Sequence, residues 1–171
     1  MNINIEIFNE YESWNFDIEN IKNIAIELFK FLMSDIEIKQ DFALKNYEYT
    51  TISFDILFCD GKKTHQINRD FRNKDYPADI ITFALFADSE EEDRIVQEFE
   101  INLGEVIIAL DKIETSANEK NIDKNIELYF MISHGIMHLL GFDHQSEEDF
   151  DFVVKKQKQA LESIGIKYDK I

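Results

Sequence analysis

The sequence predicts an α/β fold, in which a single domain over 1–171 has a mixed sheet of about four strands with helices packed on one side of it. Two patterns support this prediction. Segments that alternate apolar and polar residues are typical of half-buried strands, and between them lie longer segments whose apolar residues recur every three or four positions, as in amphipathic helices. With 171 residues and 44% hydrophobic residues, the chain is long enough to bury a sizeable core.

Four strands are expected, at 2–8, 50–58, 79–85 and 103–108. The first places Ile3, Ile5 and Ile7 on one side. The second carries apolar residues at every other position and is followed by the turn signal Asp60-Gly61.

Helical periodicity or capping predicts five helices, at 18–33, 64–71, 111–119, 121–140 and 147–163. The last begins after Ser146, a favourable N-cap followed by three acidic residues, and Gly165 is a suitable C-terminal stop. The pattern over 35–47 fits either a loop or a further strand. The acidic run at 88–93 is expected to be a solvated loop.

The composition excludes some classes of function. Lys and Arg number 18 against 35 Asp and Glu, and the net charge of −17 disfavours nucleic-acid binding over the whole surface. An RNA-binding function therefore needs a local basic patch. The one cysteine, Cys59, lies in an apolar run and is expected to be buried. Because the sequence shows no disulfide pair, no signal-peptide pattern and no apolar run of membrane-spanning length, we expect a cytoplasmic protein with no membrane partner.

Three of the four histidines lie close together near the end of the 121–140 helix. His134 and His138 are four residues apart, so they share one helix face. Gly141 can end the helix, and His144 can then turn back towards the other two. Such a pair alone also fits core histidines bonded to backbone, but the third histidine favours metal. Three imidazoles with an open position for water are typical of a catalytic zinc site, so we predict one Zn²⁺ ion as cofactor.

The residue after the first histidine argues against proteolysis. The spacing matches the metzincin pattern H-E-x-x-H-x-x-G-x-x-H, but position 135 is Gly where those peptidases carry the glutamate that acts as general base.

The same stretch resembles a known family. The YbeY family carries the signature H-G-x-L-H-L-x-G-Y-D-H, which this chain resembles at His134-Gly135-x-x-His138-Leu139-x-Gly141-x-Asp143-His144. Met137 and Phe142 replace Leu and Tyr, and both remain apolar. The family comprises bacterial rRNA maturation factors described as single-strand-specific, metal-dependent endoribonucleases.

A second stretch extends the resemblance. The family segment L-N-x-x-Y-R-x-x-D-x-P-T-D-V-L-S-F is matched here at Asn68, Arg72, Asp75, Pro77, Asp79 and Phe83, with departures at Phe71, Ala78, Ile81 and Thr82. The resemblance implies that Arg72 lies by the metal and is needed for activity. A guanidinium is permanently charged and grips a phosphate through parallel hydrogen bonds, so Arg72 is the predicted catalytic residue.

Arg72 belongs to a basic window. From Lys62 to Lys74 there are five cations and one acid, Asp70. We expect Arg69 and Lys74 to bind substrate together with Arg72, and the Arg72 side of the metal cleft to be locally positive. The alternative is a solvated helix face that binds no ligand.

Three carboxylates are candidates for support of the metal ligands. Glu105 stands in L-G-E-V-I-I, which resembles the family's L-G-D-I-x-I, and Asp79 lies in the second stretch. Asp143 either orients a ligand histidine, caps the turn or, less favourably, acts as the general base.

The residues alone predict a metal-assisted hydrolase with an anion-binding arginine. The resemblance implies a zinc-dependent endoribonuclease, specific for single-stranded RNA, that acts in rRNA processing and ribosome maturation, with the ribosome or a ribosomal protein as a further partner. The bound metal would lower the pKa of its water to about 7, for attack on phosphorus or deprotonation of the ribose 2′-hydroxyl. The alternatives are a non-catalytic ribosome assembly factor with a structural metal and another zinc hydrolase, of which a peptidase is disfavoured.

Overall fold

A computed structural model describes residues 1–169 of the chain and confirms the α/β fold. Four strands form one mixed sheet in the order β1-β2-β4-β3, made of β1 (Asn2–Asn9), β2 (Thr51–Cys59), β3 (Ile80–Phe83) and β4 (Glu100–Ala109). The β1–β2 and β2–β4 pairs are parallel, and β3 pairs antiparallel with β4 at the edge. β3 is shorter than predicted because the chain turns after it, where the Leu85 N–H donates to the Phe83 carbonyl.

Six α-helices connect and flank the strands: α1 (Ile18–Ser34), α2 (Ile36–Asp41), α3 (Gly61–Phe71), α4 (Leu110–Lys120), α5 (Lys124–Leu139) and α6 (Glu147–Ser163). Ser146 caps α6 as predicted, since its hydroxyl accepts a hydrogen bond from the Asp149 N–H. Within the acidic run, Glu91–Asp93 forms a short 3₁₀ turn, η1. No helix in the described part of the chain is long and apolar enough to cross a membrane.

The segment after α1 is neither the loop nor the strand that its pattern allowed. Asp35 starts α2 by accepting a hydrogen bond from the Ile38 N–H, and Ile38 is buried. The buried ammonium of Lys156 on α6 lies 2.7 Å from Asp35 and 2.9 Å from Glu37. A distant residue therefore supports this short helix, which is why the local pattern did not predict it.

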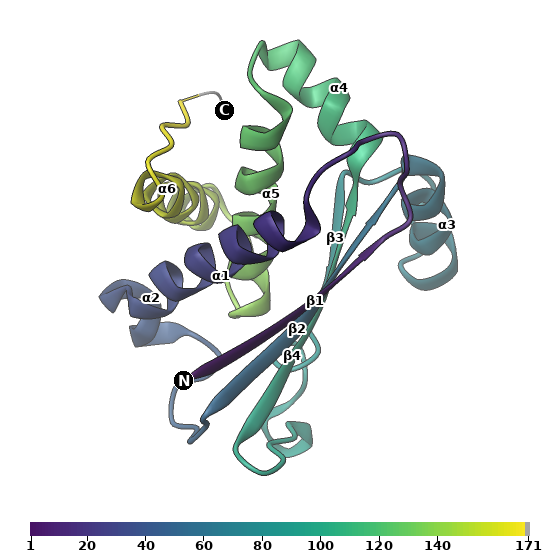
Figure 1. The fold of residues 1–171 in the computed structure, drawn as a ribbon. Helices are drawn as coiled ribbons and strands as arrows, with labels where there is room; N and C mark the ends of the chain where they lie inside the picture. The colour runs from purple at the N-terminus through teal and green to yellow at the C-terminus, as the bar shows by residue number, and fades with distance from the viewer. Residues whose placement is uncertain (170–171) are drawn as a thin grey trace.

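Helices cover both faces of the sheet, so the prediction that they lie on one side is wrong. Figure 1 shows α1, α5 and α6 on one side of the strands and α3 on the other. The cause is that the central strands are apolar on both faces, as is usual for parallel strands. Ile107 of β4, Cys59 of β2 and Ile67 of α3 form a small second cluster on the α3 side.

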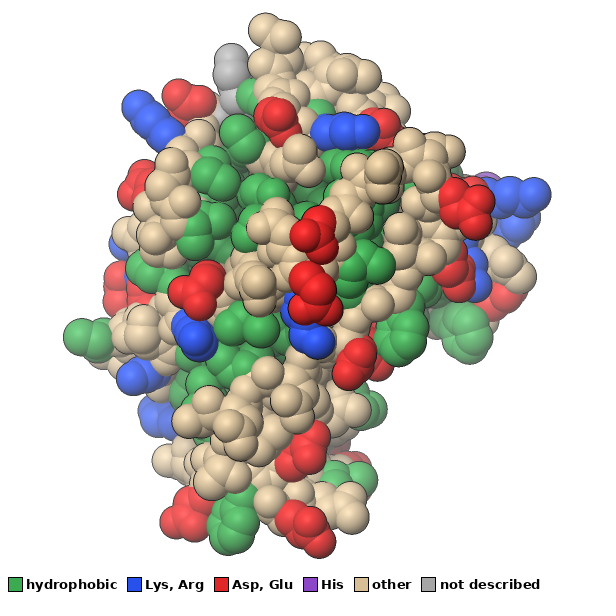
Figure 2. All heavy atoms as spheres, viewed as in Figure 1, with side chains coloured by type: hydrophobic (Ala, Val, Ile, Leu, Met, Phe, Trp, Pro, Cys, Tyr) green, Lys and Arg blue, Asp and Glu red, His purple; other side chains and the backbone are tan. Residues whose placement is uncertain are grey.

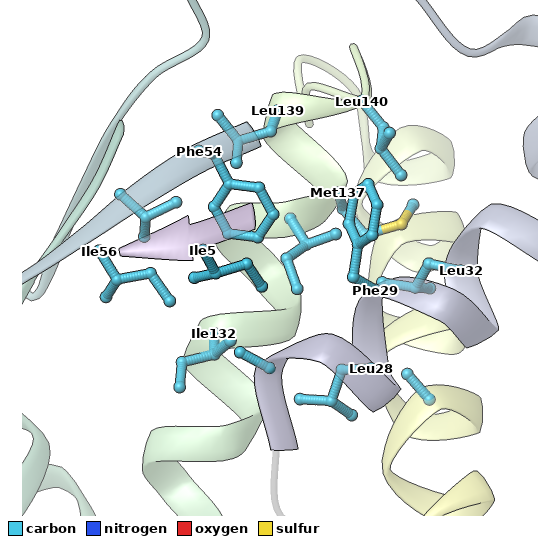
Figure 3. Packing of buried hydrophobic residues seen from close by; sticks show 14 of the residues in the cluster. Ile5, Leu28, Phe29, Leu32, Phe54, Ile56, Ile132, Met137, Leu139 and Leu140 are labelled. Atoms are coloured by element: carbon cyan, nitrogen blue, oxygen red, sulfur yellow. The ribbon is translucent and has the colours of Figure 1, made fainter. Parts of the chain in front are cut away.

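The main core lies between the sheet, α1 and α5. Figure 3 shows side chains from these three parts in contact, and the residues it labels include Ile5, Phe54, Leu28, Phe29, Ile132 and Met137. Helix α5 is thus held by apolar contacts along its length, as the sequence predicted for the helix that carries the first two histidines.

A bulge in β4 fits the sheet to α5. Leu103 and Val106 both belong to the main core although they are three positions apart, an offset that places residues on opposite faces of a regular strand. The pairing with β2 shifts register between Asn102 and Glu105. Gly104 makes this possible with φ +128°, and a Cβ there would lie 1.9 Å from the Phe83 carbonyl oxygen. Only glycine fits this position, and the bulge turns Val106 towards α5.

Candidate metal centre and arginine loop

The end of α5 explains how the third histidine returns to the first two. The Phe142 N–H donates to the Met137 carbonyl and the Gly141 N–H to the His138 carbonyl, both at 3.0 Å. With Gly141 at φ +100°, these bonds form a Schellman motif, which reverses the chain after the helix. The predicted bend at Gly141 is therefore confirmed.

The bend brings the rings of His134 and His144 together. Their centroids are 5.2 Å apart, and the His144 ring also packs edge-on against Phe150. Two imidazoles that share a tetrahedral zinc at about 2 Å from each nitrogen would have centroids about 5 Å apart. Within residues 1–169, however, no three His, Cys, Asp or Glu side chains stand in a metal-holding arrangement. The spacing of the His134 and His144 rings fits a shared ion. The three histidines predicted as ligands do not yet stand together in a metal-binding arrangement.

Gln157 of α6 determines the orientation of the His134 ring. Its side-chain nitrogen donates to the Phe130 carbonyl at 3.0 Å, so its oxygen faces His134 Nδ1 at 3.2 Å. An amide oxygen only accepts, so Nδ1 must carry the proton and Nε2 keeps its lone pair. In zinc sites the second nitrogen of a ligand histidine is commonly held in this way.

Burial favours the neutral form of His134. The pKa of the ring is lowered mainly because the ring is desolvated, and the nearby His144 and His138 lower it further. The hydrogen bond to Gln157 acts in the opposite direction. A neutral imidazole is the form that binds a metal.

Gly135 is packed directly against the sheet. A Cβ at this position would lie 2.6 Å from Cγ1 and 2.9 Å from Cγ2 of Val106. The position that holds the general base of metzincin peptidases therefore faces β4 here, and it has no room for a glutamate side chain.

Asp143 serves the turn that carries His144. One carboxylate oxygen accepts from the His144 N–H at 2.8 Å and the other from the Gln145 amide at 3.1 Å. Burial acts to raise the pKa of Asp143, but these hydrogen bonds and the nearby His138 and His144 outweigh it, and the pKa lies below its usual value. Both contacts lie within the turn and fit the turn-capping role, while a role in orienting a ligand histidine stays a prediction.

Arg72 is held by Asn68, a residue that sequence reasoning gave no role. Arg72 Nη1 donates to Asn68 Oδ1 at 2.8 Å, and Asn68 Nδ2 donates to the Tyr76 carbonyl at 2.8 Å. Within residues 1–169, Arg72 forms no hydrogen bond to the three histidines, and it follows α3 rather than α5. No direct contact therefore links Arg72 to the predicted metal ligands, and its position beside the metal stays a prediction.

The basic window keeps several cations without a carboxylate partner. Lys63 pairs with Glu10, and His65 binds Asp75 at 2.7 Å. In the described chain Arg69 and Lys74 form no ion pair. Figure 2 shows Lys or Arg side chains projecting at the α3 end of the molecule, beside carboxylates.

Within residues 1–169, neither Glu105 nor Asp79 forms a hydrogen bond or ion pair with the three histidines. Glu105 lies two residues before Ile107, so it shares the α3 face of the sheet, whereas Val106 points at α5. Burial raises the pKa of Glu105, and Asp55 adds to the effect. Asp79 is influenced chiefly by burial, which raises its pKa, and by charges on α4 such as Lys112. The role of both residues beside the metal ligands stays a prediction.

Two other features lie outside this region. Cys59 is buried as predicted, and burial raises the pKa of its thiol to about 12. A cavity of about 550 Å³ is lined by Leu85, Phe86, Arg94 and residues of β4, but by none of the histidines. The Arg94 guanidinium donates to the carbonyls of Phe86, Ala87 and Ser89, so it supports this loop.

Together these features define an α/β protein whose buried helix α5 and following turn present three histidines. Arg72 lies on the loop that joins α3 to the edge strand β3. Residues 6–165 match the family model described as endoribonuclease YbeY. The chain belongs to the YbeY family, as the motifs predicted.

Named relatives agree with this assignment. The chain is similar to the endoribonuclease YbeY of Fusobacterium nucleatum, with 37% identity over 115 residues, which are 67% of this chain and 68% of the relative. It is 42% identical to that of Bacillus subtilis over 104 residues, 60% of this chain and 66% of the relative. The solution structure of TM1509 from Thermotoga maritima has a TM-score of 0.55 at 23% identity and covers 94% of this chain and 91% of its own. This last likeness concerns the fold alone.

Proposed function

We propose that this protein is a zinc-dependent endoribonuclease that cuts single-stranded RNA in rRNA processing and ribosome maturation, in the cytoplasm. Membership of a family whose members are named endoribonucleases supports the reaction class. The main observation in favour of metal binding is the state of the His134 ring. Its Nδ1 is hydrogen-bonded to Gln157, so its Nε2 is available to bind a metal ion.

His134, His138 and His144 would hold the ion. The first two come from one face of a buried helix, which fixes their backbone positions. His144 lies on the exposed turn after the helix, and its ring already stands 5.2 Å from that of His134. When bound, zinc would neutralise charge on a phosphoryl oxygen and supply an activated water.

Arg72 would bind the scissile phosphate and stabilise the charge that develops on it. Asn68 engages one guanidinium nitrogen, which leaves the other N–H groups of Arg72 available to a phosphate. Arg69 and Lys74 would bind neighbouring phosphates of the same strand.

The packing of Gly135 against Val106 favours this reading over a zinc peptidase, since no glutamate can stand beside the histidines at that position. A non-catalytic assembly factor with a structural metal is the other alternative, and three protein ligands rather than four speak against a purely structural zinc.

The test is cleavage of a short single-stranded rRNA 3′-end precursor by the wild-type protein and by His138→Ala. Gln40→Ala, an exposed substitution on α2 outside the motif, is the control. We expect wild type and Gln40→Ala to cut, His138→Ala to be inactive and a chelator to abolish cleavage. Equal cleavage by His138→Ala would refute the metal site as the nuclease. If no preparation cuts either free RNA or immature ribosomal particles, the assembly-factor alternative gains instead.

A further inference from the structure

Two aromatic side chains between α3 and β3 are exposed to solvent. Phe71, the last residue of α3, is 75% exposed, and Tyr76 is 49% exposed. Exposed aromatic side chains on one short segment are candidates for a binding surface.

The segment that displays these rings is built on Asn68, whose side chain is fully buried. The Asn68 amide nitrogen binds the Tyr76 carbonyl, and the Asn68 backbone carbonyl accepts from the N–H groups of Arg72 and Lys74 at 3.0 and 3.1 Å. Asn73 turns the chain with φ +53°. The backbone from the end of α3 to Tyr76 is therefore folded back on Asn68.

Side-chain contacts further along hold the same segment to α3. The buried Thr64 hydroxyl donates to the Ala78 carbonyl at 2.7 Å, and His65 binds Asp75 at 2.7 Å. Since the segment is fixed at both ends and in the middle, the exposure of Phe71 and Tyr76 follows from the fold. A rigid display of rings reduces the entropy lost when a ligand binds.

The charges around the rings favour a polyanion. Arg69 precedes Phe71, and Arg72 and Lys74 lie between Phe71 and Tyr76. Of the two nearby acids, Asp75 is engaged by His65 while Asp70 is not. This local excess of positive charge stands out in a chain with a net charge of −17. Aromatic faces combined with cations that track a backbone are the features with which proteins bind single-stranded nucleic acid.

We propose that Phe71 and Tyr76 form a stacking platform for unpaired RNA bases, while Arg69, Arg72 and Lys74 bind the phosphates between them. Asn68 is the positioning residue that presents both groups. The proposal rests on the proposed function for its ligand, and it provides a physical basis for preference for single strands. In a duplex the base faces are already stacked on one another and are not available to the rings.

The test measures binding, separately from cleavage. Fluorescence anisotropy with a labelled 2′-O-methyl oligoadenylate, checked on a gel to be intact, gives the Kd of the metal-loaded wild type, Phe71→Leu, Phe71→Trp and Tyr76→Leu. The control is Phe8→Leu, because Phe8 is 53% exposed on β1, at the opposite edge of the sheet. Thermal unfolding confirms that each exposed substitution leaves the fold intact.

We expect Phe71→Leu to weaken binding about 5- to 100-fold, as loss of one stacked base predicts, and Tyr76→Leu to act in the same direction. Phe71→Trp and Phe8→Leu should bind as wild type does, and the duplex form should bind weakly to all of them. Unchanged binding by Phe71→Leu and Tyr76→Leu would overturn the platform, as would equal affinity of the wild type for duplex and single strand. Binding of the 2′-O-methyl oligonucleotide does not depend on cleavage. The binding assay therefore detects the platform even if the protein cuts no RNA, and it can exclude the platform even if the protein is a nuclease.

Discussion

Gln157 hydrogen-bonds His134 across the α5–α6 interface, with 3.2 Å between Oε1 and Nδ1. The direction of the bond is not arbitrary, because Phe130 O can only accept and so takes the amide N–H. The buried Gln157 side chain is thus held by the backbone of α5 and in turn fixes which nitrogen of His134 carries the proton.

Gln157→Leu should weaken zinc binding about 10- to 100-fold, the usual cost of losing the partner of a ligand histidine. Without the acceptor, His134 is no longer held with its proton on Nδ1. Zinc affinity is measured by competition with a chelating dye, and the tautomer by ¹⁵N NMR of the imidazole.

The matched control is Gln159→Leu, the same substitution on the same helix at a partly buried position. Gln157→Glu keeps an acceptor towards His134 but loses the donor to the Phe130 carbonyl, so it should recover only part of the affinity. Wild-type zinc affinity in Gln157→Leu, with a normal fold, would refute the role given to this residue.

The sequence predicted the strands, most helices and the histidine motif because these depend on local spacing. It did not reveal Gln157, which reaches His134 from 23 residues away through packing of two helices. A signal was present, since a polar residue at an inward position of α6, between Val153 and Ala160, is unusual. Likewise α2 depends on Lys156, and the position of α3 on the second face follows from apolar residues on both sides of the central strands.

Gly135→Ala should destabilise the protein by about 1–3 kcal/mol, because the new methyl group overpacks the contact with Val106. The free energy of unfolding from urea titration measures the effect. Val106→Ala removes the two methyl groups that clash, so the double variant should lose less stability than the sum of the single changes. Strict additivity would show that the close approach of α5 to β4 does not limit the size of residue 135.

Glu105→Gln should alter how stability depends on pH. Burial raises the pKa of Glu105 in the folded protein, so over the range between the unfolded and folded pKa values the folded state binds more protons. Wild type therefore loses this contribution to stability as the pH rises above about 4.3, the unperturbed value for glutamate. Glutamine does not ionise, so Glu105→Gln does not lose stability in this way as the pH rises.

Relative to wild type, Glu105→Gln should be more stable at pH 7 than at pH 3.5 by unfolding in urea. Glu100→Gln, an exposed residue of the same strand, serves as the control. A difference between wild type and Glu105→Gln that stays constant over this pH range would contradict the assignment.

Arg72→Gln should reduce kcat for RNA cleavage about tenfold to a thousandfold, because a charged donor to the scissile phosphate is lost. Zinc content should be unchanged, since Arg72 forms no bond to the histidines in residues 1–169 and follows another helix. Arg69→Gln is the informative comparison, as it removes a cation from the same helix. If Arg69 only binds a neighbouring phosphate, its loss raises KM and the salt sensitivity of binding while kcat stays near wild type. If Arg72→Gln and Arg69→Gln raise KM equally and leave kcat unaffected, Arg72 is only one of several phosphate contacts. Other groups would then stabilise the charge that develops on the scissile phosphate.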